Sequence, residues 1–259
     1  MTRKLLLILA LILAMTAPVF AQWPRTPTKG LPRLPDGKPN LAAPAPKGAD
    51  GKPDISGLWQ PAPLYIGDIS RDLKPGELPF QPWAEELYKH RRETQSKDDP
   101  TGWCVPGGVP RSDAVPYPFK ILQTPGMVAI LYEAVHSFRQ IFMDGRAHPK
   151  DVNPTWYGHS VGHWEGETLV VDTVGFNDLF WFDFVGHPHT EKLHTVERYT
   201  RTDFGTLKEE VTIDDPGAYT RPFTLHASHR LVPGDEIMEY ICQENQKDTQ
   251  HLVGPAGRP

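Results

Sequence analysis

The chain has 259 residues and carries 32 acidic against 27 basic side chains, which gives a formal net charge of −5. Nucleic acids and anionic membrane surfaces are bound through clustered Lys and Arg, so this mildly acidic composition argues against both as partners. The length suffices for one large β-domain or two small ones.

Residues 1–21 have the pattern of a cleavable secretory signal peptide. Arg3 and Lys4 form the positive start, an apolar run of about ten residues follows, and small residues precede the expected cleavage after Ala21. The run is shorter than the roughly 20 residues that cross a bilayer. We expect an exported protein, periplasmic or secreted, with no membrane span after cleavage; an uncleaved anchor is the alternative. Loss of Arg3 and Lys4 changes the charge from −5 to −7.

The only two cysteines are Cys104 and Cys242. An oxidising compartment favours a disulfide between them. In the chain-entropy model, closing so long a loop contributes about 4–5 kcal/mol to stability. We predict this disulfide, and the alternative is two buried free thiols.

The composition divides the mature chain into three parts. Residues 22–53 are rich in Pro, Gly and Lys and predict an extended or disordered arm, in which PDGKPN and ADGKPD indicate one turn used twice. Residues 54–247 are expected to form a single β-domain, and residues 248–259 a flexible tail. The segment 82–97 is the one predicted helix, since it begins with Pro, has acidic residues in its first turn and basic residues towards its end.

From residue 119 onward the apolar residues alternate with period two, and short turn signals separate the segments. The predicted strands are 119–124, 127–134, 137–144, 155–164, 168–174, 193–202, 207–214, 223–231 and 237–243. Consecutive strands without intervening helices indicate an all-β, mainly antiparallel fold. We expect an up-and-down barrel, because closure removes sheet edges, with a two-sheet sandwich as the alternative.

Seven of the eleven histidines lie within residues 136–194. Strand alternation places Tyr157, His159 and His163 on one face, where we expect them to bind substrate in a cavity. The two histidines are too far apart along a strand to share one metal ion, and an exposed strand face is the alternative. A serine nucleophile is not expected, because Ser160 lies in mid-strand and not at a strand–turn–helix junction.

His187 and His189 flank a proline, which places them in a loop or at a strand entry. A His-x-His pair on an extended segment presents two imidazoles on one side, and this arrangement suits proton transfer. We therefore predict His187 and His189 as catalytic groups without a cofactor. A divalent metal at these two histidines and a purely structural turn are the alternatives.

The predicted strand 193–202 carries a charged residue on each of its faces, Glu197 on one and Arg198 on the other. Glu197 shares its face with Tyr199 and Arg201, so a barrel would carry some charge inside, and a buried charge must be paired or functional. We predict Glu197 as a catalytic base and Arg198 as its charge partner and a substrate-binding group. A salt-bridged surface strand is the alternative.

Asp172 interrupts the most apolar strand in the chain, 168–174. Either one face of that strand is exposed to solvent or the Asp172 carboxylate reaches into a polar cavity. We predict a catalytic role for Asp172. Trp181 follows in the next loop and suits stacking on a substrate, although packing against the barrel end is the commoner use of such a residue.

Several long strings resemble a large family of exported bacterial hypothetical proteins: PTWYGHSVGHWEGETLVVDTVGFND, GHPHTEKLHTVERYTRTDFG and VTIDDPGAYTRPFT. The resemblance covers about residues 55–245 and is in keeping with a lipocalin-like, calycin-type barrel. The family pattern keeps the GHPH-x-E and ERY segments but often replaces His159 and His163. It thereby shifts weight towards His187, His189 and Glu197, and it implies no established activity.

These patterns predict an exported enzyme that acts on a small organic or carbohydrate-like molecule in a barrel cavity. Histidine and carboxylate acid–base chemistry would make it a lyase, hydrolase or isomerase. Two alternatives stay open. A non-catalytic calycin-like binder would have a mostly apolar interior, and an envelope-interaction protein would dock a partner through the Pro-rich arm.

Overall fold

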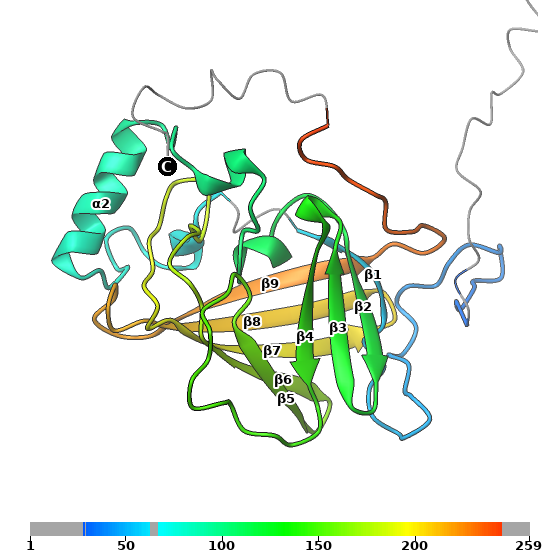
Figure 1. The fold of residues 1–259 in the computed structure, drawn as a ribbon. Helices are drawn as coiled ribbons and strands as arrows, with labels where there is room; N and C mark the ends of the chain where they lie inside the picture. The colour runs from blue at the N-terminus through cyan, green and yellow to red at the C-terminus, as the bar shows by residue number, and fades with distance from the viewer. Residues whose placement is uncertain (1–27, 29, 63–66, 245–259) are drawn as a thin grey trace, which may run out of the picture.

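Nine strands close into one barrel in the computed structural model, which describes residues 28, 30–62 and 67–244 (Figure 1). The strands are β1 (Gly57–Pro61), β2 (Phe119–Thr124), β3 (Met127–Tyr132), β4 (Ser137–Phe142), β5 (His159–Glu165), β6 (Thr168–Val174), β7 (His194–Asp203), β8 (Thr206–Asp214) and β9 (Phe223–Leu231). The predicted all-β barrel is confirmed, and the sandwich alternative is excluded. The predicted signal peptide and C-terminal tail lie outside the described residues.

The strands follow one another around the barrel in chain order, and β1 closes it by pairing with β9. Each pairing is antiparallel except that between β4 and β5, which is parallel and is registered only at Ile141–Ser160 and Phe142–Val161. The neighbouring β3–β4 pair is registered along its whole length, from Met127–Phe142 to Tyr132–Ser137. The seam between β4 and β5 is therefore the most open part of the barrel wall.

Side chains alternate between the two faces of the wall, as the period of the sequence predicts. On β7, Thr195, Glu197, Tyr199 and Arg201 are buried while the residues between them are partly exposed or exposed. The interior is therefore not uniformly apolar. Aromatic and aliphatic side chains such as Trp59 share it with charged ones.

One end of the barrel is covered by helices and two long loops, residues 175–193 and 215–222 (Figure 1). The helices are α2 (Pro82–Glu93) and the 3₁₀ segments η1 (Ile69–Asp72), η2 (Pro100–Trp103), η3 (Arg111–Asp113) and η4 (Ala134–His136), of which η4 joins β3 to β4. Phe80, just before α2, forms an isolated bridge with Tyr219, which ties the helix to this end. The helix stops four residues before the predicted end because Gln95 and Ser96 adopt left-handed backbone angles.

The N-terminal arm lies against the opposite end. The amide of Gly205, in the turn between β7 and β8, donates to the carbonyl of Leu41 at 2.8 Å. The two similar strings of the arm form the same turn: in each, an aspartate carboxylate, Asp36 or Asp50, accepts the backbone N–H two residues later. The repeated turn is thus confirmed, and residues 41–43 bind the backbone of the β7–β8 turn.

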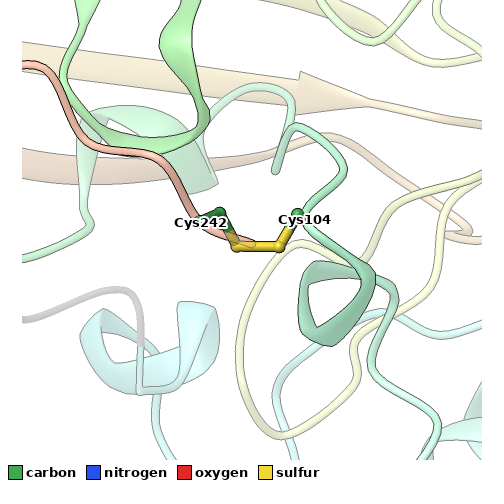
Figure 2. Close-up of a disulfide and its surroundings, with 2 residues drawn as sticks. All are labelled: Cys104 and Cys242. Atoms are coloured by element: carbon green, nitrogen blue, oxygen red, sulfur yellow. A yellow bond between two sulfur atoms is a disulfide. The ribbon is translucent and has the colours of Figure 1, made fainter. Parts of the chain in front are cut away.

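The Cys104–Cys242 disulfide joins the residue after η2 to the segment that follows β9, with the two Cα atoms 5.7 Å apart (Figure 2). The predicted disulfide is confirmed, whereas the predicted strand 237–243 is wrong. The backbone of residues 237–243 is bound by side chains instead of a neighbouring strand, since the amide of Met238 donates to a carboxylate oxygen of Glu133 at 2.9 Å.

Among the helices of the described residues, none has the length and apolar composition of a membrane span.

Candidate functional site

A cleft of about 740 Å³ opens in the barrel wall at the β4–β5 seam. Since β4 meets β5 only at its last two residues, no strand of the described chain pairs with residues 137–140 on that side. The opposite wall is the segment that leads into β5, residues 154–160. A molecule in this opening touches both the outer surface and groups that face the barrel interior.

The walls of the cleft combine aromatic rings with hydrogen-bonding groups. Phe138 is 63% exposed although it is a large apolar residue, and Phe142 and Trp156 line the cleft beside it. Tyr157 and Asn177 are buried polar residues of the same lining. Such a mixture is typical of sites for small organic molecules, in which apolar walls bind and a few polar groups orient.

Three histidines and one aspartate form a continuous hydrogen-bonded chain beside the cleft. His159 Nδ1 lies 2.8 Å from His148 Nδ1, and His148 Nε2 lies 2.8 Å from Asp172 Oδ1. The second oxygen of Asp172 is 2.9 Å from His194 Nε2. The members come from the 143–158 connection, β5, β6 and β7, and all are partly exposed. His159 is also part of the cleft lining.

The order of the chain fixes the tautomers when Asp172 is ionised and the histidines are neutral. Asp172 accepts one hydrogen bond from the N–H of His148 Nε2 and one from the N–H of His194 Nε2. His148 Nδ1 is then unprotonated and accepts a hydrogen bond from the N–H of His159 Nδ1. The remaining nitrogen, His159 Nε2, therefore carries a free lone pair at the cleft end of the chain.

The electrostatics of the chain support this assignment. Burial opposes ionisation of Asp172, but hydrogen bonds from His194 and His148 outweigh it and hold the pKa of this carboxyl below its ordinary value. Burial lowers the pKa of His159, and so does the repulsion that a charged His159 imidazole would meet from Arg146 and from His148 in its protonated form. At neutral pH the aspartate is thus ionised and His159 is free of its second proton.

A single glycine decides which side chains face the cleft. Gly158 has φ +61°, and a Cβ there would lie 2.6 Å from the carbonyl oxygen of Val174. The left-handed residue interrupts the strand alternation, so Tyr157 turns into the protein while His159 faces out. Tyr157 Oη lies 2.6 Å from Ser137 Oγ and 3.0 Å from Ser112 Oγ. The prediction that Tyr157 shares a face with His159 and His163 is therefore wrong.

Arg139 of β4 connects the cleft with the barrel interior. It lines the cleft with Ser160, yet both side chains are buried. Its guanidinium forms a two-pronged ion pair with the buried carboxylate of Glu197, with Nη1 donating to Oε1 at 2.7 Å. Nε donates to Ser160 Oγ at 3.0 Å, and Nη2 donates to Thr173 Oγ1 at 2.8 Å. Glu197 is thus an inward charge, as predicted, but Arg139 and not Arg198 is its partner.

Two further carboxyl groups lie close to Glu197 inside the barrel. Asp113, Glu197 and Glu209 each place one oxygen within 4.8 Å of the others, and all three are buried. Burial and the charge of Glu197 raise the pKa of Glu209 to about 8, and burial with the charges of Glu209 and Glu197 raises that of Asp113. Burial lowers the pKa of His229, which is bound to Glu209, to about 4. The cluster of Asp113, Glu197, Glu209, His229 and Arg139 therefore holds one ion pair, Arg139–Glu197, among neutral groups.

His187 lies at the covered end of the barrel, apart from this network. Its Nδ1 is 2.5 Å from Asp183 Oδ2, and its ring stacks on Tyr88 with centroids 4.2 Å apart. It lines a separate pocket of about 310 Å³ beside η1 and α2. Asp183 also accepts backbone N–H groups from Ile69, Gly186 and His187 itself, so it holds the 183–187 loop together.

The other predicted residues of this region fill structural positions. His189 packs against Phe180, with ring centroids 3.9 Å apart, and burial lowers its pKa to about 4. Trp181 is buried under the guanidinium of Arg91, 4.1 Å from its ring centroid. No hydrogen bond or ring contact between described residues joins His187, His189 or Trp181 to the cleft chain.

His163 and Arg198 lie on the outer surface. Both contact the Glu165 carboxylate, whose oxygens lie 3.2 Å from His163 Nε2 and 2.8 Å from Arg198 Nη2.

Of the predicted site residues, the fold brings together Asp172, His159 and Tyr157 around the cleft, with Glu197 behind Arg139. His148 and Arg139 were not predicted. His148 follows a turn after β4, and only the local density of histidines pointed to it.

Two groups of three described residues have the spacing of metal ligands: Asp113, Glu197 and Glu209, and Asp68, Asp183 and His187. Each already has strong internal partners, since Arg139 neutralises Glu197 and four N–H groups surround Asp183. Neither group includes His189, the second histidine of the predicted metal alternative.

No protein-family model and no curated protein matches the chain.

Proposed function

We propose that the protein is an enzyme that binds a small organic or carbohydrate-like molecule in the β4–β5 cleft and uses His159 as its general base. The observation that supports this most is the chain His159–His148–Asp172–His194, with one end at the cleft and an ionised carboxylate within it. A base oriented through a second group that is bound to a carboxylate is a recurrent catalytic arrangement.

The chain gives each residue a distinct task. His159 Nε2 accepts a proton from the substrate, and the imidazolium that forms is stabilised through His148 by the negative charge of Asp172. Asp172 stays ionised, and His194 fixes its second oxygen. Positioned acid–base groups of this kind typically accelerate a reaction about 10²–10⁴-fold. Glu197 then serves to hold Arg139 at the back of the cleft and does not act as the base.

The proposal needs only side chains of this protein, so it stays within cofactor-independent lyase, hydrolase or isomerase chemistry. The disulfide supports a site of action in an oxidising compartment outside the cytoplasm. His187 and His189 are assigned to the covered end of the barrel and take no part in this reaction.

A non-catalytic small-ligand binder is the second candidate. The exposed aromatic wall at Phe138 favours it, because apolar surface of this kind binds ring-shaped ligands without chemistry. A carrier of apolar molecules should nevertheless have a mainly apolar interior, and Arg139, Glu197, Asp113 and Glu209 make this one polar.

The test is a substrate screen followed by matched variants. A panel of esters, lactones, glycosides and hydroxy-ketones is assayed for turnover, and the best substrate is used with Asp172→Asn, His148→Ala and the control His163→Ala. His163 lies on the same strand as His159 but outside the cleft lining. We expect kcat/KM to fall at least about 100-fold in the first two variants and to stay within about twofold in the control.

Equal turnover in wild type and Asp172→Asn would contradict the proposal. If no compound is turned over but one binds equally well to wild type and Asp172→Asn, the result favours the binder.

A further inference from the structure

His187, at the covered end of the barrel, has one polar atom that no group of the described protein satisfies. Its Nδ1 lies 2.5 Å from Asp183 Oδ2, and the same carboxylate accepts three backbone N–H groups. The neutral imidazole therefore carries its proton on Nδ1 and keeps a lone pair on Nε2. Within the described ranges Nε2 has no hydrogen-bond partner, although the side chain is only 1% exposed.

The surroundings of the imidazole direct Nε2 into the pocket of about 310 Å³ beside η1 and α2, here called the η1–α2 pocket. His187 lines this pocket and Asp183 does not, so the Nδ1 side of the ring faces away from it. Tyr88 stacks on the imidazole with centroids 4.2 Å apart, and Phe80 lies nearly parallel to it at 5.6 Å. The ring is thus held in one orientation, with its Nε2 side towards the pocket.

The walls of the η1–α2 pocket are apolar beside the histidine and charged at the rim. Leu78 and Pro79 line it together with the rings of Phe80 and Tyr88. The side chains of Lys74 and Lys89 are 84% and 64% exposed, so they mark the side that is open to solvent. An apolar cavity of about 150 Å³ holds benzene. The η1–α2 pocket therefore has room for one substituted aromatic ring.

The free nitrogen decides which polar group the ring must carry. Nε2 is an acceptor, so the ligand has to bring a donor. The charge-assisted hydrogen bond from Nδ1 to the Asp183 carboxylate polarises the imidazole and makes Nε2 a stronger acceptor. A phenolic O–H suits this atom, because the aromatic ring spreads the charge left on the oxygen and makes the proton a good donor.

A metal ion suits this nitrogen less well. The one described group of metal-ligand spacing that contains His187 consists of Asp68, Asp183 and His187. Asp68 and Asp183 are not part of the pocket lining, and both already accept hydrogen bonds from backbone N–H groups. On the pocket side a cation would therefore meet one imidazole nitrogen without a second ligand from this group.

We propose that the η1–α2 pocket is a second binding site, which takes small phenols and holds their O–H on His187 Nε2. The ring of the ligand packs against Leu78, Phe80 and Tyr88. The site is independent of the proposed general-base chemistry, because its lining shares no residue with that of the β4–β5 cleft.

Equilibrium binding of two probes of the same shape tests the inference. 4-Fluorophenol carries the donor, 4-fluorotoluene has a methyl group in its place, and ¹⁹F NMR with the full chain gives both dissociation constants. We expect wild type to bind the phenol about tenfold more tightly, the effect of about one good hydrogen bond. His187→Asn should bring the ratio close to one, since its amide N–H still serves Asp183 but Nε2 is gone. Phe138→Ala, in the cleft, should keep the ratio.

A second measurement keeps the inference testable if His187→Asn does not fold. In ¹⁵N NMR of wild type, 4-fluorophenol should move the Nε2 resonance of His187 and leave that of His159 in place, and 4-fluorotoluene should move neither. A ratio near one in wild type or an unchanged ratio in His187→Asn would overturn the inference. Loss of the ratio in Phe138→Ala would place the phenol in the cleft, and a His187 response to zinc chloride alone would make the site a metal site; either result overturns it too.

Discussion

The two faces of strands β5 to β7 carry the same kinds of residue in different surroundings. On the inner face Ser160, Thr173 and Glu197 surround Arg139, and every charge has a partner. One residue away, the outer face carries His159, Asp172 and His194, which form a half-exposed chain with an open end at the cleft.

The difference teaches how burial assigns a role to a titratable group. The inner network has little freedom to exchange protons with solvent, because burial holds its neutral members neutral and the ion pair closed. The outer chain retains access to solvent and ligand, so it suits proton transfer. We therefore expect substitutions in the inner network to change stability and substitutions in the outer His159–His148–Asp172–His194 chain to change activity.

The largest effect should follow from breaking the inner ion pair. Arg139→Met leaves the carboxylate of Glu197 buried without its counter-charge, and breaking a buried pair from one side costs about 3–5 kcal/mol of unfolding free energy. Urea denaturation measures it. The double variant Arg139→Met, Glu197→Met should recover most of the loss, since a well-packed apolar pair often replaces a buried ion pair without cost. A single variant as stable as wild type would show that the pair is not closed.

The next effect concerns Glu209 and has a defined pH dependence. Its pKa is raised from 4.5 to about 8 in the folded barrel, so its contribution to stability is present below pH 4.5 and is lost as pH rises to 8. Glu209→Gln removes that loss and should stabilise the protein relative to wild type by an amount that reaches about 3 kcal/mol near pH 7. His229 acts in the opposite direction, because its lowered pKa of about 4 removes stability as pH falls below 6.5.

Unfolding free energies of Glu209→Gln and wild type at pH 5, 6, 7 and 8 test this sign. The control is Glu210→Gln, on the exposed side of the same strand. If the difference between Glu209→Gln and wild type does not grow with pH, the carboxyl is not held neutral in the core.

Gly158 separates the two faces, and changing it should have a smaller effect. Gly158→Ala must keep φ +61° while its Cβ meets the Val174 carbonyl oxygen, so we expect a loss of about 2 kcal/mol or more. The control is Gly166→Ala in the β5–β6 turn, where φ is +62° but no atom lies within 4 Å of the added Cβ. Equal losses in both variants would mean that the close approach at Gly158 has no cost.

The smallest effect is expected at the outer-face ion pair of Arg198 and Glu165. Both side chains are about half exposed, and exposed pairs contribute about 0.2–1 kcal/mol. Arg198→Met should therefore change the unfolding free energy by less than about 1 kcal/mol and leave activity unaltered. A loss comparable to that of Arg139→Met would erase the contrast between the two faces.

The barrel could be predicted from the sequence because each strand has its own alternating pattern and turn. The burial alternation of β7, with Glu197, Tyr199 and Arg201 inside, follows directly from that period. The parallel β4–β5 seam could not be predicted, since its direction depends on where the 143–158 connection returns. The strand predicted at 237–243 failed because side chains of the η4 region, and not a strand, bind its backbone.

The site was predictable only in part, for a related reason. Asp172 stood out because it interrupts an apolar strand, and its outward direction accounts for the interruption. Arg139 gave no local signal and His148 only that of a histidine-rich stretch, since their importance comes from partners 58 and 24 residues away. His187 was conspicuous in the sequence, but its buried partner Asp183 shows that such a pattern also serves to order a loop.

The central claim, that His159 is the base at the end of a coupled chain, can be tested by ¹⁵N NMR of the histidine rings between pH 5 and 9. At neutral pH we predict a proton on His148 Nε2 and on His159 Nδ1, with His159 Nε2 unprotonated. In Asp172→Asn, the titration of His159 should change. A proton on His159 Nε2, or identical titration of His159 in both proteins, would contradict the account.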